Sequence, residues 1–325
     1  MEKLLDVEEE RLTVFPIKNH KIWESYKTQL SAFWRVEEID FSQDYTDFMT
    51  LTQDEQHVIK MVLAFFAISD GLINLNLRER FLMEVKNTEA QTTYAYQMMI
   101  EYIHGECYSL MLETLIKDPV EKDKLFNAVK EFESIKMIMD WAMKWINSDK
   151  SFAHRLIAFV FMEGGFFSSA FATIFWLKRY RGHGRHFMNG LIKSNEFISR
   201  DEGEHCRFAC LLYSQLENKL PQAEVYEIFD DALIIAKNFA KDSIQCELIG
   251  LNCDLMFQYL ECISDRLLAD LGYEHKYHKT NPFTFMETIS LTKKTNFFES
   301  RPTDYQSAHN KDNLALTEIT LSEDF

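Results

Sequence analysis

The chain has 325 residues, of which only 10 are glycine and 5 are proline, and its formal net charge is −16. Sandwiches and barrels need turn residues about every 8 to 12 positions, so this shortage of glycine and proline excludes them and predicts an all-α protein. The acidic charge, in a sequence without a basic stripe, also excludes nucleic acid as an expected partner.

The first clear helix start follows an irregular N-terminal segment. Residues 1–50 predict a loosely structured arm with short helices, and the capping-box sequence Thr52–Glu55 then predicts a helix that continues to about residue 81. Asp118 followed by Pro119 predicts a second start, because Asp is a good cap and Pro suits the first helical position. Further helices are predicted over 154–179, 193–217, 223–244 and 248–271.

The character of the chain changes at about Glu299. The segment from there to Phe325 has few apolar residues and no helical period, which is typical of a flexible tail. We therefore predict two parts, a helical domain over residues 1–298, which includes the N-terminal arm, and a tail over 299–325.

One apolar segment is long enough to span a membrane. Leu156–Leu177 is a run of 22 residues with a single charged residue, Glu163. Ser168, Ser169 and Thr173 interrupt the run, and no other segment is as apolar. We therefore interpret it as a helix buried on all sides within a large bundle, and expect no membrane association.

The cysteines indicate a reducing compartment. They lie within apolar helical patterns and form no CxxC pair, and the charged N-terminal sequence MEKLLDVEEERL does not resemble a secretory signal. We therefore expect reduced thiols in a cytoplasmic protein. The six cysteines are Cys107, Cys206, Cys210, Cys246, Cys253 and Cys262.

Two carboxylates occur where a helix core should be apolar. Asp70 lies within the apolar run 62–73, and Glu163 lies within the run described above. Burying an unpaired carboxylate costs several kcal/mol, against a total stability of about 5 to 15 kcal/mol. Both residues must therefore be compensated, by water, by an arginine or by a cation.

Two further helical segments add imidazoles. Glu101 and His104, and likewise Glu202 and His205, are spaced i and i+3 and so share one face of a helix. Two such pairs, together with one inward carboxylate on each of two other helices, match the known pattern of ferritin-like di-iron and di-manganese proteins. Carboxylates with two imidazoles suit iron or manganese. A zinc protease is not favoured, since His-Glu-x-x-His does not occur.

The register of the second pair stays open by spacing alone. Asp201 and Glu204 are both near enough to His205 to be ligands, but Glu202 repeats the spacing of the first pair. Asp201 then becomes a candidate for holding a ligand imidazole through its other nitrogen. Tyr108 falls four residues after His104 on the same stripe, so its ring is expected near the metals. Apolar side chains that could surround the phenol are Phe167, Phe171 and Ile198.

The sequence closely resembles the small, radical-generating subunit of class I ribonucleotide reductase. The matching segments span nearly the whole chain in family order, which makes the resemblance highly specific. They are FWRVEEIDFSQD (33–44), LAFFAISDGLINLNLRERF (63–81), IEYIHGECYSLML (100–112), MEGGFFSSAFATIFWLK (162–178), SNEFISRDEGEHCRFACLL (194–212), NPFTFM and KKTNFFESRPTDYQ (within 281–306), and the terminal SEDF.

The resemblance implies a function for particular residues. It implies a ferritin-like all-α bundle, a homodimer, whose two iron ions activate oxygen, with manganese as the alternative metal. Tyr108 would carry a stable radical, Trp34 and Asp201 would relay it through His104, and Tyr305 would pass it to the large catalytic subunit. The last residues, ending at Phe325, would dock on that subunit. The implied metal ligands are Asp70, Glu101, His104, Glu163, Glu202 and His205.

Three features depart from the family pattern. Gly105 stands where the family usually has Ser, Glu204 stands where an apolar residue is common, and the connection Arg179–Asn189 is longer and more basic than usual. The first leaves the ligands intact, whereas the second raises the question of metal preference. Two rival functions share part of the pattern: another di-iron carboxylate oxidase, such as a desaturase or hydroxylase, and an iron-storage protein.

Overall fold

The computed structural model describes residues 2–182, 186–245 and 247–286. Contacts delimit one compact unit, Met1–Phe283, and a second, Thr284–Phe325. Most of the second unit, with Tyr305 and Phe325, lies outside the described residues. The domain boundary predicted at residue 298 also lies there and stays a prediction.

The all-α class is confirmed for the described residues, in which the single extended pairing is an isolated bridge between Leu248 and Leu251. The helices of the N-terminal half are α1 (His20–Ser31), α2 (Asp44–Phe48), α3 (Gln53–Asn76), α4 (Leu82–Glu84), α5 (Thr88–Leu115), α6 (Pro119–Phe126), α7 (Ala128–Glu131) and α8 (Glu133–Ile146). Those of the C-terminal half are α9 (Phe152–Phe161), α10 (Phe167–Tyr180), α11 (Asn189–Ser214), α12 (Gln222–Ser243) and α13 (Cys253–Asp270). Two π-helical segments interrupt longer helices, η4 (Leu77–Phe81) after α3 and η5 (Met162–Phe166) between α9 and α10.

The predicted helix starts have the expected caps. The Glu55 amide donates to Thr52 Oγ1 at 3.3 Å, and the Thr52 amide donates back to Glu55 Oε2 at 2.9 Å, which is a complete capping box. The Glu121 amide donates to Asp118 Oδ1 at 2.7 Å. The start predicted at residue 248 was wrong by five residues. Gly250, with φ of +76°, turns the chain there, and Asn252 caps the helix that follows.

The N-terminal arm is more firmly attached than the sequence indicated. Glu2 accepts hydrogen bonds from the amides of residues 217 and 218, and the Leu4 carbonyl accepts one from the Lys86 amide at 2.7 Å. Glu89, which is buried at the start of α5, pairs with Arg11 and accepts from the Lys18 amide. The arm is therefore held against the rest of the protein near residues 2–4 and again near residues 11–18. The expectation of a loosely structured arm was wrong for these described residues.

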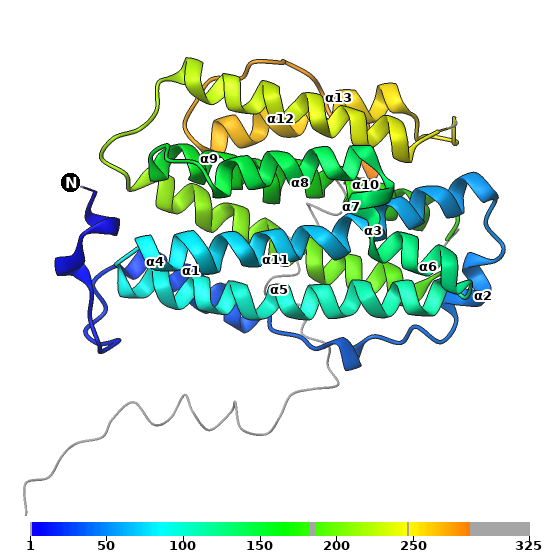
Figure 1. The fold of residues 1–325 in the computed structure, drawn as a ribbon, viewed down its shortest axis with the longest axis horizontal. Helices are drawn as coiled ribbons and strands as arrows, with labels where there is room; N and C mark the ends of the chain where they lie inside the picture. The colour runs from blue at the N-terminus through cyan, green and yellow to red at the C-terminus, as the bar shows by residue number, and fades with distance from the viewer. Residues whose placement is uncertain (1, 183–185, 246, 287–325) are drawn as a thin grey trace, which may run out of the picture. The chain divides into compact units, whose positions relative to one another are not determined.

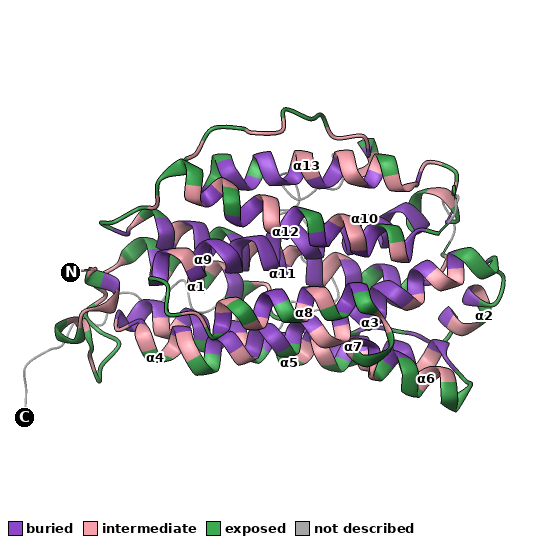
Figure 2. Ribbon diagram, turned by 45° about the horizontal axis from the view of Figure 1, so that its top comes forward, coloured by how far each residue is buried: buried purple, intermediate pink, exposed green. Residues whose placement is uncertain are grey.

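The inner helices α3, α5, α10 and α11 lie against one another, and α12 and α13 pack together as an outer pair (Figure 1). The inner helices are buried along most of their length, whereas the outer pair buries the side that faces them (Figure 2). Side chains from the four inner elements therefore meet away from solvent.

Two helical stretches, Gln53–Glu84 and Phe152–Tyr180, are long and apolar enough to cross a membrane by length and composition alone. The first stretch has the higher mean hydropathy, 1.8 against 1.5, so the expectation that no other segment is as apolar as Leu156–Leu177 was wrong. In their most apolar windows, 72% and 94% of the residues are buried inside the protein. The second stretch contains the run Leu156–Leu177, so the prediction that this run is a buried core helix is confirmed.

Candidate metal centre

Four elements of the bundle direct ligand-type side chains to one place in the interior. Each of these side chains has a relative exposure of 2% or less. They are Asp70 from α3, Glu101 and His104 from α5, Glu163 from η5, and Glu202 and His205 from α11. The structure thus brings together all six residues proposed as ligands from the sequence.

The six residues form two overlapping groups. Ligand atoms of Glu101, Glu163, Glu202 and His205 lie within 4.8 Å of one another, and so do those of Asp70, Glu101 and His104. Glu101 belongs to both groups. If each group held one metal ion, Glu101 would be a ligand available to both.

Both imidazoles turn the same nitrogen toward the carboxylates. His104 Nδ1 lies 3.0 Å from Glu202 Oε1 and 3.3 Å from Glu101 Oε2. His205 Nδ1 lies 2.9 Å from Glu101 Oε1 and 3.2 Å from Glu202 Oε2. Asp201 contacts the opposite nitrogen, His104 Nε2, at 3.3 Å. Glu202 therefore lies among the six clustered side chains, and Asp201 lies outside both ligand groups.

The residues fit a pair of metal ions because their buried polar atoms lack other partners. Apart from contacts among the six residues themselves, no hydrogen bond within the described part of the chain reaches either oxygen of Asp70 or Glu101, Glu163 Oε2, Glu202 Oε1 or His104 Nδ1. Unsatisfied buried carboxylates are costly without a cation. Carboxylate oxygens and imidazole nitrogens are ligands that iron and manganese accept.

The electrostatics of the group show the same need for positive charge. Burial raises the pKa of Asp70 well above its ordinary value, and the neighbouring Glu101 raises it further. Burial and the neighbouring Glu202 likewise raise the pKa of Glu163. A cation among these carboxylates would favour their charged forms and reverse both effects.

The π-helical segment that carries Glu163 depends on two glycines. A Cβ atom on Gly164 would lie 2.6 Å from Leu267 Cδ2 and 2.9 Å from Cys206 Sγ, and one on Gly165 would lie 2.6 Å from the Phe161 ring. Glycine therefore permits the close packing around the bulge. Gly203, beside Glu202 on α11, is not under the same constraint, since a Cβ there would meet no described atom nearer than 3.7 Å.

Tyr108 lies near Asp70 in the interior, and its hydroxyl has no hydrogen-bond partner among the described residues. Its ring stacks on Phe66, with centroids 4.4 Å apart and planes at 6°. Burial raises the pKa of the phenol well above its ordinary value, and the nearby Asp70 raises it further. Phe171 and Phe167 contact Phe66 at 5.0 and 5.7 Å and so form an outer layer.

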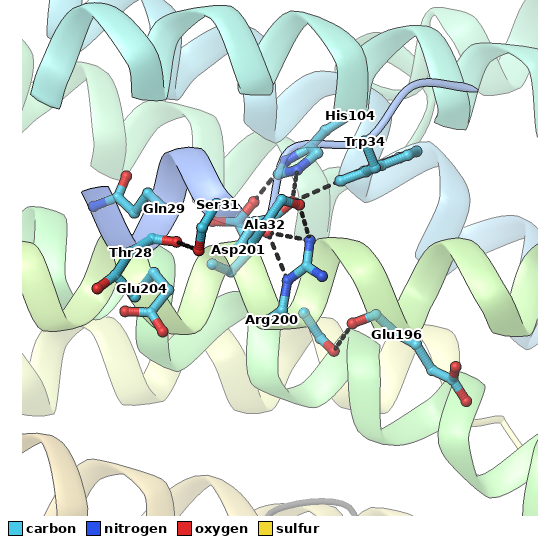
Figure 3. A network of polar contacts seen from close by, with 12 residues as sticks. Thr28, Gln29, Ser31, Ala32, Trp34, His104, Glu196, Arg200, Asp201 and Glu204 are labelled. Carbon is cyan, nitrogen blue, oxygen red and sulfur yellow. Dashed lines mark hydrogen bonds and ion pairs between the residues drawn. The ribbon is translucent and has the colours of Figure 1, made fainter. Parts of the chain in front are cut away.

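Asp201 joins Trp34 to His104. The Trp34 indole Nε1 donates to Asp201 Oδ2 at 2.7 Å, and His104 Nε2 lies 3.3 Å from the same oxygen (Figure 3). Arg200 donates to Asp201 Oδ1 from Nη2 at 2.9 Å and also to the Ala32 carbonyl at 2.6 Å. Burial works to raise the pKa of Asp201, but the hydrogen bond from His104 and the charge of Arg200 outweigh it, so the pKa is lowered.

Sequence reasoning missed three neighbours of the site. Phe66 precedes Asp70 by one helical turn, and Gln97, fully buried one turn before Glu101, donates from Nε2 to Glu163 Oε1 at 2.7 Å. Both could have been found by extending the ligand stripe one turn toward the N-terminus. Arg200 gave no such signal, because an arginine beside an aspartate on a helix usually points to solvent.

Among the described residues, the departures from the family pattern lie outside the two ligand groups. The Glu204 carboxylate pairs with Arg207 and belongs to neither ligand group; in Figure 3 it points away from His104. A Cβ atom on Gly105 would meet no described atom within 4 Å. In the connection 179–189, residues 183–185 lie outside the described residues, and Arg181 pairs with Glu55.

Comparisons with known proteins agree over most of the chain. The family model for ribonucleotide reductase, small chain, matches residues 11–282. The chain is 52% identical over 308 residues to the ribonucleoside-diphosphate reductase small chain of Encephalitozoon cuniculi, covering 94% of this chain and 93% of that one. It is 50% identical over 307 residues to the small chain of Spisula solidissima, covering 94% and 79%.

The solved structures agree with the sequence relatives. The homodimer of ribonucleotide reductase Rnr4 from Saccharomyces cerevisiae matches with a TM-score of 0.78 and 33% identity, over 90% of this chain and 93% of that one. The R2 subunit from Clostridium botulinum matches with a TM-score of 0.75 at 22% identity, which shows the fold alone. The predicted ferritin-like bundle with additional helices is thereby confirmed.

Proposed function

Because this chain belongs to the family of ribonucleotide reductase small chains, we propose that its six buried ligand side chains hold the family's di-iron centre and that Tyr108 carries the radical. The protein is the small subunit of ribonucleoside-diphosphate reductase, an oxidoreductase that supplies deoxyribonucleotides. The family's cofactor is a di-metal centre, with iron as the metal and manganese as the alternative for this ligand set.

One observation carries the assignment of the ligands. Asp70, Glu101, Glu163 and Glu202 lie together in the interior, and at least one carboxylate oxygen of each has no hydrogen-bond donor among the described residues outside the six ligand side chains. Four carboxylates balance the charge of two divalent ions. Glu101, which belongs to both ligand groups, would bridge them.

The residues around Tyr108 suit the storage of a radical. The bound iron pair, with oxygen, supplies the oxidising power that removes an electron and a proton from the phenol. Tyr108 is 1% exposed and stacks on Phe66, so solvent and external reductants are kept from the ring. Tyr108 follows Glu101 by seven residues and so lies in line with the ligand stripe of α5.

The oxidising equivalent would leave the site along hydrogen bonds. We propose that His104, Asp201 and Trp34 pass the oxidising equivalent outward, since their polar atoms are joined at 3.3 and 2.7 Å. Tyr305, outside the described residues, would pass it to the large catalytic subunit, and the tail 299–325 would dock there through its end at Phe325.

A second copy of the chain is the other proposed partner. Met99, Tyr102 and Leu110 are exposed at helical spacing along one side of α5 and, with the exposed Glu106 among them, form a mostly apolar stripe on the surface. The Saccharomyces cerevisiae relative is a homodimer. A homodimer that covers this stripe, in the cytoplasm, fits these features and the absence of a disulfide among the described cysteines.

The two rival functions, another di-iron carboxylate oxidase and an iron-storage protein, account for fewer features of this site. A desaturase or hydroxylase would share the ligand set but would need neither Tyr108 nor the Trp34–Asp201 hydrogen bond. A storage protein would have no use for a phenol enclosed by Phe66 beside the metal ligands.

The test is to load the metal-free protein with ferrous ion, add oxygen, and record optical and EPR spectra. We expect a di-ferric centre and a tyrosyl radical, and we expect Tyr108→Phe to form the centre without the radical. Tyr94→Phe is the matched control. Tyr94 is also on α5 and fully buried, and its hydroxyl has no hydrogen-bond partner among the described residues. A radical that survives Tyr108→Phe but not Tyr94→Phe would overturn the assignment.

A further inference from the structure

Trp34 contacts two rings. His104 stacks on the indole, with centroids 6.0 Å apart and planes at 21°. Phe197 contacts it at 5.3 Å with the planes at 45°. Phe197 precedes Asp201 by one turn of α11, so the residue that contacts the indole ring and the residue that accepts its N–H come from the same helix face.

Phe197 also faces two cations. Lys193 Nζ lies 4.6 Å and Arg200 Cζ lies 5.4 Å from the centre of its ring. Lys193 is half exposed, whereas Trp34 is 2% exposed and Phe197 is intermediate. The phenylalanine ring therefore contacts the buried indole and, at the same time, two charged groups near the surface.

We propose that Phe197 is a positioning residue for the radical relay: it covers Trp34 against solvent and holds the indole so that Nε1 donates to Asp201. This inference rests on the relay role proposed above for Trp34. The cations over the ring fix its orientation, because ammonium and guanidinium groups are attracted to aromatic faces.

The physical need for such a cover follows from the hydrogen bond itself. A water molecule that reached this side would compete for the indole N–H and for Asp201 Oδ2. In a dry, low-dielectric environment the charge-assisted bond between the indole and the carboxylate is stronger and its geometry is better defined. Without an apolar cover over Trp34, the bond would exchange with water.

A second phenylalanine provides a matched control. Phe257 on α13 is also of intermediate exposure and also lies beneath two cations, Lys237 Nζ at 5.7 Å and Lys241 Nζ at 5.5 Å. Among the described residues, no tryptophan ring stacks on it. Its truncation removes the same kind of surface contact without uncovering Trp34.

The experiment uses the full-length, iron-loaded protein and the variants Phe197→Ala, Phe197→Leu and Phe257→Ala. A brief pulse of hydroxyl radicals, followed by mass spectrometry of the peptide that contains Trp34, measures the accessibility of the indole. In parallel, turnover with the large subunit is divided by the tyrosyl radical content from EPR. Iron content and helical circular dichroism identify any variant that fails to fold.

We expect Phe197→Ala to increase oxidation of Trp34 at least fivefold and to lower turnover per radical at least tenfold. Phe197→Leu should restore protection, because it returns an apolar side chain, and Phe257→Ala should match the wild type in both measurements. Unchanged labelling of Trp34 in Phe197→Ala would overturn the covering role of Phe197. Increased labelling with normal turnover would show that Phe197 covers the indole but is not needed for the relay, which would overturn its role as a positioning residue. If Trp34→Phe itself turns over normally, the proposed relay is wrong, and the labelling result still reports separately whether Phe197 covers the indole.

Discussion

The indole nitrogen of Trp34 donates a hydrogen bond of 2.7 Å to Asp201 Oδ2, although 167 positions separate the two residues in the sequence. The same oxygen lies 3.3 Å from His104 Nε2, and the Nδ1 atom of that imidazole faces the carboxylates. A single carboxylate therefore connects the buried Trp34, which lies between α1 and α2, to a proposed metal ligand on α5.

The positions of Asp201 and Glu202 predict opposite effects of two neighbouring substitutions. Glu202→Ala removes a carboxylate from the ligand group, so we expect loss of bound iron. Asp201→Ala leaves the group intact but removes the partner of Trp34, so the protein should keep its iron and lose turnover with the large subunit. Iron analysis and a coupled activity assay measure both effects, and the reverse pattern would show that the ligand register is wrong.

The tail should matter for assembly and not for the metal site. Deletion of the final seven residues, 319–325, is expected to abolish turnover with the large subunit, because the proposed docking segment ends at Phe325. The tyrosyl radical yield should remain that of the full chain. A truncated protein with a normal reductase rate would contradict the docking role of the tail.

The π-helical segment predicts a steric cost at Gly164. In Gly164→Ala the new Cβ would lie 2.6 Å from Leu267 Cδ2, so we expect the free energy of unfolding to fall by about 1 to 3 kcal/mol. Gly71→Ala is the control, since Gly71 also follows a proposed ligand but its Cβ would meet no described atom within 4 Å. This control should gain about 0.5 to 1 kcal/mol from helix propensity. Urea unfolding of both variants measures the difference, and equal stabilities would contradict the close packing.

Asp44 predicts a dependence of stability on pH. It caps α11 from another element, accepting from the Gly190 and Leu191 amides at 3.0 and 2.7 Å. Burial nevertheless raises its pKa from 3.8 to about 6, with nearby Asp47 and Asp40 adding negative charge.

Because the folded protein then holds this proton more tightly than the unfolded chain, the contribution of Asp44 is greatest below pH 3.8 and is lost as the pH rises toward 6. The loss is at most about 3 kcal/mol, at about 1.4 kcal/mol per pKa unit. Asp44→Asn cannot titrate, so the stability of the wild type relative to this variant should decline between pH 4 and pH 6 in denaturant titrations. Parallel pH profiles for the two proteins would show that Asp44 keeps its ordinary pKa when folded.

Local sequence determined most of the helical framework. The shortage of glycine and proline excluded a β architecture, and the caps at Thr52 and Asp118 marked helix starts that the structure contains. The start expected at residue 248 was displaced because a turn at Gly250 precedes the Asn252 cap. The arm was expected to be loose because its contacts, such as Glu2 with the amides of residues 217 and 218, join residues far apart in sequence.

The same limit applies to the candidate site. A period of 3.6 residues places Glu101 with His104, and Glu202 with His205, on one helix face, because both spacings are properties of a single helix. It does not determine which helices lie side by side, at what height, or which rotamer each side chain adopts. Only the packed bundle decided that Glu101 belongs to both ligand groups and that Asp201 contacts the outer nitrogen of His104. The contacts of Phe66, Gln97, Arg200 and Phe197 were decided in the same way, because they depend on distances between helices, which side-chain packing sets and no single segment of the sequence encodes.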